Sequence, residues 1–521
     1  MQGSEKIVNT LDAHIGISTR DAIKIILLSI LFVASSFFLQ GNIDLNPADE
    51  GYLWYGAWRT SLGEIPIRDF QSYDPGRYYW SAAFLKLLGN GIISLRISLA
   101  VFQAIGLTFG LLILKRFISR QWILVSSGML LLVWMYPSYK IFEPVISLVA
   151  LYFAVLLIEK PNLRQHFIAG VFVGIAAFFG RNHGLYNFIG FLALIIFLFF
   201  KIERSDFFKK IAVWISGILL GYSPMIFMLI FVPGFFDSFI NSITFLFRFG
   251  ATNYPLPVPW PWVPQKGSFS TSSVFTGMFF LILPVFYMLS MIYLLFTRNA
   301  TQKKSLFVAA TFIGIPYMHY AFSRAGIVHL ALSIQPLLIG MMSLHFVLHS
   351  KYKKLITLFV ISIFIMSFFS IANLSFSSSK IMKKRMEKLN IAGDGIWVKE
   401  KTANLIKAVK QINDKHVKHD EGILLAPNLP TLYPIIGQSS PLWDIYFLFK
   451  ETGERQKEMI SELKKKDVNW IVLGDIPIDG RNELRFRNTH NLVWQHFKEC
   501  FEPVEFEGLS SEYQLLHRKR C

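Results

Sequence analysis

Long apolar runs recur along most of the chain, and they constrain its fold more than any other feature. A helix that crosses a bilayer needs about 20 mostly apolar residues, because each residue adds about 1.5 Å across a hydrocarbon layer about 30 Å thick. The sequence therefore predicts a polytopic α-helical membrane protein with about 11 transmembrane helices. The eleven segments are 22–39, 93–114, 121–136, 141–158, 166–180, 184–200, 211–232, 273–296, 305–322, 326–348 and 355–374. The third and fourth are short, and their boundaries are poorly defined.

The composition agrees with a membrane protein and raises a question of its own. Of 521 residues, 53% are hydrophobic and 17% are charged, yet lysine and arginine outnumber aspartate and glutamate by 52 to 34, a net charge of +18. Basic proteins often bind nucleic acid, but the chain has no DNA- or RNA-binding motif, and most of its basic residues flank apolar runs. We therefore expect no nucleic-acid partner. Two cysteines, Cys500 and Cys521, allow one disulfide at most.

The placement of the basic residues predicts an orientation. The first apolar run follows a long polar stretch, 1–21, and no small-residue cleavage site precedes Gly41, which favours a retained helix over a cleaved signal peptide. Every second loop is basic, so the positive-inside rule places the N-terminus in the cytoplasm. These loops carry Lys115/Arg116/Arg120, Lys160/Arg164, Lys201/Arg204/Lys209/Lys210, Arg298/Lys303/Lys304 and Lys351/Lys353/Lys354. With eleven spans, the C-terminus lies outside.

The outer side is expected to hold most of the polar mass. A first outer loop, 40–79, and a second, 234–271, interrupt the transmembrane module 1–376, and a polar tail, 377–521, follows it. The stretch 254–264, rich in proline and tryptophan, is open to two interpretations, a mobile cover over a site or an ordinary interfacial loop.

The tail 377–521 is expected to form a small extracytoplasmic α/β domain. Strands are predicted at 422–426, 469–473 and 513–517, between helices at 398–415, 454–465 and 488–501. This alternation indicates a small parallel or mixed sheet. No catalytic motif occurs in the tail, so we expect a structural or substrate-contacting role for it.

Two adjacent carboxylates, Asp49 and Glu50, follow the first span. A carboxylate at the membrane–water boundary can serve as general base toward a hydroxyl group. A structural interpretation is equally open for Asp49, because Asn46 is a suitable N-cap, Pro47 suits the first helical position, and an acidic residue favours a helix N-terminus. The two interpretations are compatible, since a capped helix holds a carboxylate rigidly.

Aromatic and basic side chains on the outer side allow two interpretations each. The aromatic residues of the first outer loop suit an interfacial belt or a surface on which a sugar stacks; they are Trp54, Tyr55, Trp58, Tyr78, Tyr79 and Trp80. The short outer links carry Lys140, Arg181 and Arg324, which suit snorkelling to headgroups or convergence on an anionic ligand. Several cations beside paired carboxylates favour a phosphate site.

Other signals limit the chemistry. His329, one turn inside the tenth span, suits a functional site or a hydrogen-bonded packing role. The chain has no Walker loop, no GxGxxG, no GxSxG and no Cys/His spacing typical of zinc, so nothing points to nucleotide, dinucleotide or serine-hydrolase chemistry.

The stretch DEGYLWYGAWRTSLGEIPIRDFQSYDPGRYYW, residues 49–80, resembles the first outer loop of integral-membrane glycosyltransferases of the GT-C fold. Within that fold it is similar to the branch that contains protein O-mannosyltransferases and aminoarabinose transferases. The resemblance covers most of the chain, from the carboxylate pair after the first span through two loop helices to the outer tail. Weaker pieces are 181–186 and 323–329.

The resemblance implies an inverting glycosyltransferase, a hexosyl- or pentosyltransferase of class EC 2.4, in the bacterial inner membrane. Such an enzyme moves a sugar from a polyprenyl-phosphate donor to an acceptor on the outer side, which would be a cell-envelope glycan, a lipid or a protein. The spans would supply a groove for the prenyl chain. The sequence does not specify the sugar or the acceptor.

The resemblance also implies roles for single residues. Asp49 matches the essential acidic residue, Glu50 its companion, and Asp74 a second acidic position. Lys140, Arg181 and Arg324, with Arg77 a further candidate, would neutralise the leaving phosphate. Arg324 and His329 match a motif in which Gly326 here replaces an aspartate. Tyr52 and Tyr55 complete the active-site candidates, and a magnesium or manganese ion, if present, would lie at Asp49, Glu50 and Asp74.

Two alternative functions are less consistent with the sequence. An O-antigen polymerase or ligase has its large outer loop late in the chain, whereas the acidic loop here comes first. A transporter or flippase for lipid-linked sugars would show inverted repeats with broken spans in matching halves, and no such symmetry is evident.

Overall fold

The computed structural model describes residues 17–202, 205–249, 254–264, 268–297, 304–348, 350–372, 386–418 and 421–519. The chain forms two compact units. The helical unit comprises Met1–Phe38, Leu99–Phe236 and Ile240–Ser377, and the loop–tail unit comprises Leu39–Ser98, Asp237–Phe239 and Ser378–Cys521. The predicted boundary between residues 376 and 377 falls within 373–385, outside the described residues.

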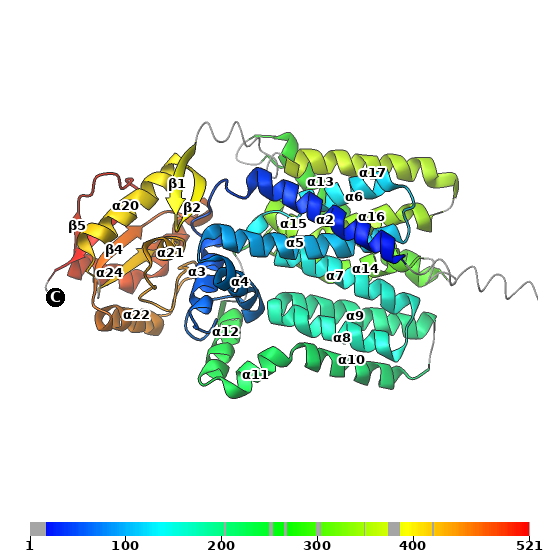
Figure 1. Cartoon of the computed structure of the whole chain (residues 1–521), viewed down its shortest axis with the longest axis horizontal. Helices are drawn as coiled ribbons and strands as arrows, with labels where there is room; N and C mark the ends of the chain where they lie inside the picture. The colour runs from blue at the N-terminus through cyan, green and yellow to red at the C-terminus, as the bar shows by residue number, and fades with distance from the viewer. Residues whose placement is uncertain are drawn as a thin grey trace, which may run out of the picture. The chain divides into compact units, whose positions relative to one another are not determined.

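The helical unit consists of long apolar helices joined by short connections, and neighbours in sequence such as α7, α8 and α9 lie side by side (Figure 1). Its elements are α2 (Thr19–Gln40), α5 (Ile92–Lys115), α6 (Gln121–Val133), η1 (Ser138–Lys140), α7 (Phe142–Glu159), α8 (Leu163–Phe179), α9 (Arg181–Lys201), α10 (Phe207–Gly221), α11 (Ser223–Phe231), α12 (Phe235–Phe249), α13 (Thr271–Phe296), α14 (Ser305–Ser323), α15 (Ile327–Ser333), α16 (Gln335–Val347), η3 (Ser350–Tyr352), α17 (Lys353–Ser367) and η4 (Phe368–Ala372). Helices α2, α5 and α12 have part of their length in the loop–tail unit.

The helix lengths confirm a polytopic helical membrane protein but not the count of eleven spans. Among the described residues, seven helices are long and apolar enough to cross a membrane, and nine segments qualify if each of two bent pairs counts as one span. Helices α6 and α8 coincide with predicted spans, yet they have 13 and 17 residues. At about 1.5 Å per residue they extend about 20 and 25 Å, less than the hydrocarbon thickness. The count of eleven therefore stays a prediction.

Both bent pairs have a proline just after the break. Helices α10 and α11 meet at 58° at Tyr222, two residues before Pro224, and α15 and α16 meet at 58° at Ile334, two residues before Pro336. Proline lacks the amide hydrogen that would continue the helical ladder, so each second helix restarts with proline in its first turn. The first pair occupies the segment predicted as one span at 211–232.

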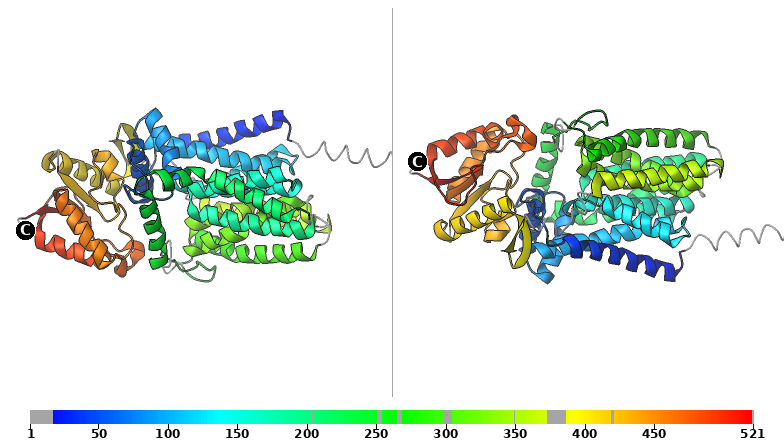
Figure 2. Two further views of the ribbon diagram at one scale, coloured as in Figure 1. Left: turned by 90° about the horizontal axis from the view of Figure 1, so that it is seen from below. Right: turned by 90° about the horizontal axis from the view of Figure 1, so that it is seen from above.

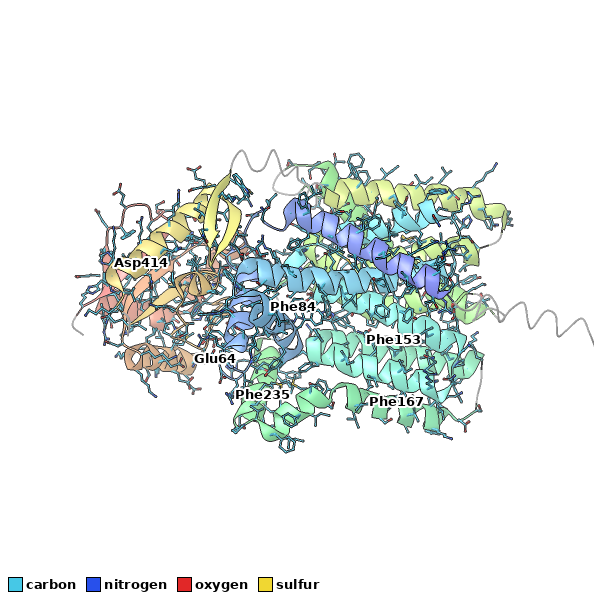
Figure 3. The ribbon with its side chains drawn as sticks, in the orientation of Figure 1. Glu64, Phe84, Phe153, Phe167, Phe235 and Asp414 are labelled. Carbon is cyan, nitrogen blue, oxygen red and sulfur yellow. The ribbon has the colours of Figure 1, made fainter. Side chains whose placement is uncertain are left out.

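Helices α8 and α10 pack through a GxxxG sequence on each helix. A Cβ placed on Gly174 would lie 2.2 Å from the carbonyl oxygen of Ile218, and one on Gly221 would lie 2.0 Å from that of Val171. At Gly217 the atom met is the carbonyl oxygen of Phe167, at 2.3 Å, a residue labelled in Figure 3. Only glycine permits such a close approach of two backbones, which is a common basis of helix association in membranes.

Polar contacts connect the ends of several helices that were predicted to lie on the cytoplasmic side. The Lys115 ammonium lies 3.9 Å from Asp21, and Arg116 pairs with Glu159. The Ser305 hydroxyl donates to Glu159 over 3.2 Å. The C-terminal ends of α5 and α7 therefore lie beside the N-terminal end of α14, while the start of α2 lies at the same end of α5.

The loop–tail unit combines two short helices with α/β structure. Helices α3 (Asp49–Ser61) and α4 (Pro75–Leu88) precede a hairpin of β1 (Met386–Ile391) and β2 (Asp394–Lys399). A mixed sheet has the order β3-β4-β6-β5, in which β3 and β4 are parallel and the other neighbours antiparallel. The remaining elements are α20 (Glu400–His416), β3 (Gly422–Ala426), α21 (Leu432–Ile436), α22 (Gly453–Lys465), β4 (Val468–Gly474), η5 (Ile478–Gly480), η6 (Asn482–Leu484), α23 (Phe486–Thr489), α24 (Asn491–Cys500), β5 (Phe501–Val504) and β6 (Tyr513–Arg518).

The predicted strands and helices of the tail are all present, and the sheet is mixed. Three further strands, β1, β2 and β5, were not predicted. The β1–β2 hairpin has polar strands and turns at Ala392 and Gly393, both at positive φ, so its hydrophobic alternation is weak. Strand β5 starts where the helix predicted over 488–501 ends early, because Pro503 cannot extend a helix.

The α3–α4 segment packs on the tail within the loop–tail unit, as both views in Figure 2 show. The amide of Thr431 donates to the carbonyl of Pro47 over 3.3 Å, and a Cβ on Gly51 would lie 2.0 Å from the Thr431 hydroxyl. The Trp443 indole donates to the carbonyl of Ile67 over 3.0 Å. Residues about 385 positions apart therefore form one packed structure.

Candidate active site

The N-terminus of α3 positions Asp49. The side-chain oxygen of Asn46 accepts hydrogen bonds from the amides of Ala48, at 3.0 Å, and Asp49, at 2.9 Å. The Asn46 side chain therefore satisfies two amides at the start of the helix, but the predicted N-cap position is wrong: the N-cap residue is Ala48, the helix begins at Asp49, and Pro47 lies in the preceding turn. The partial positive charge of the helix N-terminus favours a carboxylate at this position.

Asp49 is half-buried and has a partner from the tail. The hydroxyl of Tyr446 donates to its Oδ1 over 3.2 Å. The carboxylate is thus fixed by its helix on one side and by a phenol from a distant part of the sequence on the other. A half-buried, oriented carboxylate is suited to accept a proton from a bound hydroxyl group.

Glu50 has a different environment from its neighbour. Its side chain is 3% exposed and forms a bidentate pair with Arg96, whose Nε and Nη2 lie 2.7 and 2.8 Å from its two oxygens. The amide of Asn46 also donates to it, over 3.3 Å. Arg96 donates in addition to the carbonyls of Gly41 and Asp44, at 3.0 and 2.6 Å. Glu50 therefore ties the start of α3 to the preceding turn.

Arg96 was not among the predicted residues. It lies in the first turns of α5, within the apolar run predicted as the second span. A charged residue in such a run needs a partner, and that rule is a signal from which Arg96 could have been found. Tyr446 has no comparable signal, because one tyrosine in a polar tail is unremarkable in sequence.

A group of aromatic side chains extends the site beside Asp49. The ring of Tyr52 contacts the rings of Tyr73 and Tyr446 edge-on, with centroids 4.9 and 5.7 Å apart. The guanidinium carbon of Arg77 lies 4.8 Å from the Tyr73 ring centroid, a cation–π contact. Burial raises the pKa of Tyr52 well above its ordinary value, so its hydroxyl stays protonated.

Asp74 and Tyr55 lie close to this group but have different contacts. Asp74 is buried and precedes α4 as its N-cap residue. The hydroxyl of Tyr55 accepts a hydrogen bond from the amide of Ser440 over 3.0 Å, and burial raises its pKa to about 12. Its ring contacts Phe70 and Tyr433. Tyr55 thus joins α3 to the tail, a structural contact that the sequence did not reveal.

The predicted metal ligands were tested against these contacts. Among the described residues, no group of three or more His, Cys, Asp or Glu side chains is arranged to hold a metal ion. Both oxygens of Glu50 are engaged by Arg96. The triad of Asp49, Glu50 and Asp74 does not fit a divalent ion unless Glu50 leaves Arg96.

The predicted phosphate-binding cations of the helical unit lie on three elements. Arg181 begins α9, and its Nη1 donates to the hydroxyl of Ser242 in α12 over 3.0 Å. Arg324 follows α14, and its Nη1 donates to the carbonyl of Tyr254 over 3.1 Å. Lys140 ends η1. Two of the three are therefore held by the region predicted as the second outer loop.

Buried polar side chains lie in the same unit. His183 is 2% exposed, and its Nε2 lies 3.7 Å from a carboxylate oxygen of Glu143 on α7. The ring of His329 stacks on that of Tyr320, with centroids 5.4 Å apart, and Tyr320 in turn contacts the ring of His183. His329 is thus a member of an aromatic–histidine cluster on α9, α14 and α15.

Comparison with known proteins identifies the fold. No protein-family model matches the sequence, and no curated protein matches it either. The structure is similar to that of ArnT from Cupriavidus metallidurans bound to undecaprenyl phosphate, with a TM-score of 0.54 and 11% sequence identity over 96% of this chain and 98% of that one. The chain has the GT-C fold. The apo structure of the same ArnT gives a TM-score of 0.51 at 11% identity, over 94% of this chain and 97% of that one.

The GT-C fold confirms the resemblance noted in residues 49–80 and the assignment to multi-pass membrane proteins. At 11% identity the likeness carries the fold alone. The roles of single residues in this chain therefore depend on its own geometry.

Proposed function

We propose that this GT-C protein is a polyprenyl-phosphate-dependent glycosyltransferase. It transfers a hexosyl or pentosyl group from a polyprenyl-phosphate donor to a hydroxyl group on a glycan, lipid or protein on the outer side of a bacterial inner membrane. The supporting observation is the contrast at the start of α3, where Arg96 engages Glu50 on both oxygens while Asp49 is half-buried and oriented by Tyr446. The ArnT structure with this fold is bound to undecaprenyl phosphate.

The proposed reaction is a single displacement with inversion. Asp49 accepts the proton of the acceptor hydroxyl as that oxygen forms a bond to the anomeric carbon of the sugar. The bond from that carbon to the phosphate oxygen breaks, and the lipid phosphate leaves with the electron pair. Its increased negative charge is stabilised by cations, for which Lys140, Arg181 and Arg324 are proposed, with Arg77 as a further candidate. A magnesium or manganese ion stays a prediction, and no step above uses one.

The remaining candidates take supporting roles in this proposal. Glu50 is a positioning residue, because its bidentate pair with Arg96 fixes the first turn of α3. Arg77 contacts the ring of Tyr73, which contacts Tyr52, and a sugar ring would stack on Tyr73, the exposed ring of this group. Asp74 and Tyr55 shape α4 and the contact with the tail. His329 belongs to the buried cluster of the helical unit.

Two observations support the proposed orientation. The pair Arg116–Glu159 joins the ends of α5 and α7, so α6 between them reverses the chain direction as a span does. We therefore propose that α6 crosses the membrane, and the predicted count of eleven spans further requires that α8 crosses it as well. Cys500 is disulfide-bonded, and disulfides persist in oxidising compartments, which supports a tail on the outer side.

The test is transfer by the purified full-length protein, supplied with a panel of polyprenyl-phosphate sugars, with release of free polyprenyl phosphate as the readout. Asp49→Asn is expected to abolish release while the protein stays folded. Asp69→Asn is the matched control, since Asp69 is an exposed carboxylate of the same loop that pairs with Arg68. If the Asp49→Asn protein releases polyprenyl phosphate at the wild-type rate, Asp49 is not the base.

A second variant tests the cations. Arg324→Ala is expected to raise the KM for the donor, because the lost guanidinium would no longer bind the phosphate. A donor titration that matches the wild-type titration would remove Arg324 from the phosphate site. Consumption of no donor in the panel by the wild-type protein, in the presence of a mixed acceptor extract, would overturn the proposed function itself.

A further inference from the structure

The contact between Asp49 and Tyr446 joins two parts of the chain that are 397 positions apart. The Tyr446 hydroxyl donates to Asp49 Oδ1 over 3.2 Å, and its ring meets the edge of Tyr52 with centroids 5.7 Å apart. Both groups belong to the loop–tail unit. The tail therefore contributes a side chain to the carboxylate that we propose as base, although it carries no catalytic motif of its own.

The backbone that carries Tyr446 is fixed by the first loop. The side-chain oxygen of Gln71 accepts hydrogen bonds from the amides of Ile445, at 3.1 Å, and Tyr446, at 2.9 Å. The backbone amide of Gln71 donates to the carbonyl of Trp443 over 2.8 Å. Gln71 thus forms hydrogen bonds to the backbone of Trp443, Ile445 and Tyr446 through its side chain and its main chain. These bonds set the position of Tyr446 relative to the loop.

The tail holds the same segment from its other side. The Arg455 guanidinium pairs with Asp444, which is 7% exposed, through Nη2 at 2.5 Å and Nε at 3.2 Å. The amide of Phe447 donates to the carbonyl of Pro427 over 3.1 Å, and its side chain lies in the tail's hydrophobic core. Asp444 and Phe447, on either side of Tyr446 in the sequence, are both held by contacts with the tail. Tyr446 therefore has little freedom to move away from Asp49.

We infer that Tyr446 is a positioning residue for Asp49, which makes the tail an integral part of the active site. The inference rests on the proposed function, because it needs Asp49 to accept a proton. A phenol that donates to one carboxylate oxygen restricts the rotation of that carboxylate, so the group presents a constant orientation to the acceptor hydroxyl. Small losses of such alignment reduce the rate of the chemical step more than they reduce binding.

The first variant is Tyr446→Phe in the full-length enzyme, which keeps the ring beside Tyr52 and removes only the hydroxyl. We expect kcat to fall about tenfold while the KM for the donor stays at the wild-type value. Tyr513→Phe is the matched control, because Tyr513 lies in β6 of the same tail and outside the site, and its kcat should not change. A thermal melt of each variant verifies that it is folded.

The second variant, Gln71→Ala, tests whether the position of the Tyr446 hydroxyl, and not only its presence, determines kcat. It leaves the Tyr446 hydroxyl in place and removes the acceptor for two backbone amides. If Tyr446 acts by alignment, Gln71→Ala lowers kcat in the same way, and the double variant is little worse than Tyr446→Phe alone. Losses of kcat that multiply in the double variant would overturn the inference.

The outcomes separate this inference from the proposed function. An inactive Asp49→Asn protein together with a Tyr446→Phe protein of wild-type kcat would overturn the role of Tyr446 and leave the proposed base intact. A rise in KM without a fall in kcat for Tyr446→Phe would also overturn it, since the hydroxyl would then act in binding. An active Asp49→Asn protein would overturn the proposed base first.

Discussion

Two buried glutamates, one in each unit, have opposite environments. Glu50 in the loop–tail unit is 3% exposed and has a bidentate arginine partner, Arg96, at 2.7 and 2.8 Å. Glu143 in the helical unit is 4% exposed, and one of its carboxylate oxygens lies 3.7 Å from Nε2 of His183, beyond hydrogen-bonding distance. Among the described residues, the other ring nitrogen of His183 has no hydrogen-bond partner.

The difference shows how each unit is held together. The loop–tail unit uses directed polar contacts, so that one arginine joins a helix start, a turn and a carboxylate. The helical unit relies on close packing of apolar and small residues, as at the four glycines of α8 and α10. Among the described residues, more of its buried polar side-chain atoms lack a hydrogen-bond partner. Loss of a polar partner should therefore cost much more stability in the loop–tail unit.

The largest expected effect is that of Arg96→Gln. The substitution removes the partner of a buried carboxylate together with the donors to Gly41 and Asp44, which should cost about 3–5 kcal/mol of unfolding free energy. Thermal and denaturant unfolding in detergent, followed by tryptophan fluorescence, would measure it. Arg68→Gln is the control, since the half-exposed pair with Asp69 should be worth less than about 1 kcal/mol. Equal losses for the two variants would contradict the comparison.

The next effect is a loss of stability of the loop–tail unit in acid. Burial, reinforced by the charge of Arg455, lowers the pKa of His490 to about 3, from 6.5. The unfolded chain therefore binds a proton at this site that the folded chain does not bind. The stabilisation is complete above pH 6.5 and is lost as the pH falls from 6.5 toward 3, by an amount on the order of a few kcal/mol.

The change His490→Phe tests this pH dependence. Phenylalanine can keep the stack on Phe486, where the two rings are 4.9 Å apart and inclined by 5°, and it does not titrate. The melting temperature of the variant should fall less steeply between pH 6.5 and 4 than that of the wild type. Parallel curves for the two proteins would show that another group sets the acid limit.

A smaller effect is expected from crowding the helical unit. Gly174→Leu would force the α8 backbone away from the carbonyl of Ile218, and overpacking of this kind costs about 1–3 kcal/mol. Ile175→Leu is the control on the adjacent position, where the side chain is 44% exposed. A melting temperature measured in detergent should fall for the first variant only. A tolerated Gly174→Leu would mean that polar contacts, and not close packing, hold α8 to α10.

The same contrast explains how much the sequence predicts. Apolar runs locate the long helices of the helical unit, and the strand at 422–426 coincides with β3, because both signals are local, whereas helix α12 was missed within the segment predicted as the second outer loop. The acidic start of α3 and the Asn46 side chain that accepts from the Asp49 amide are also local features. Tyr446 was missed because its importance depends on a partner 397 positions away, and the partner of Arg96, 46 positions away, was missed although a charge in an apolar run signals that a partner exists. Contacts of that range follow from the fold and leave no spacing pattern.

The smallest expected effect concerns the pair in the helical unit. His183→Gln should cost about 1 kcal/mol or less, because the substitution breaks a contact of 3.7 Å that is already too long for a hydrogen bond. Its stacking on Tyr317, with centroids 5.8 Å apart, is the larger loss. Glu143→Gln should be nearly neutral, since glutamine keeps the volume of the side chain and carries no charge that would have to be buried.

A double-mutant cycle of His183→Gln and Glu143→Gln sharpens this prediction. A coupling energy below about 0.5 kcal/mol would show that the two side chains act independently in stability. The same cycle on Glu50 and Arg96 should give a coupling of several kcal/mol, because each substitution alone leaves a buried partner uncompensated. Equal coupling in the two cycles would mean that the helical unit depends on directed polar contacts as much as the loop–tail unit does. The distance between Glu143 and His183 would then be a poor guide to their interaction.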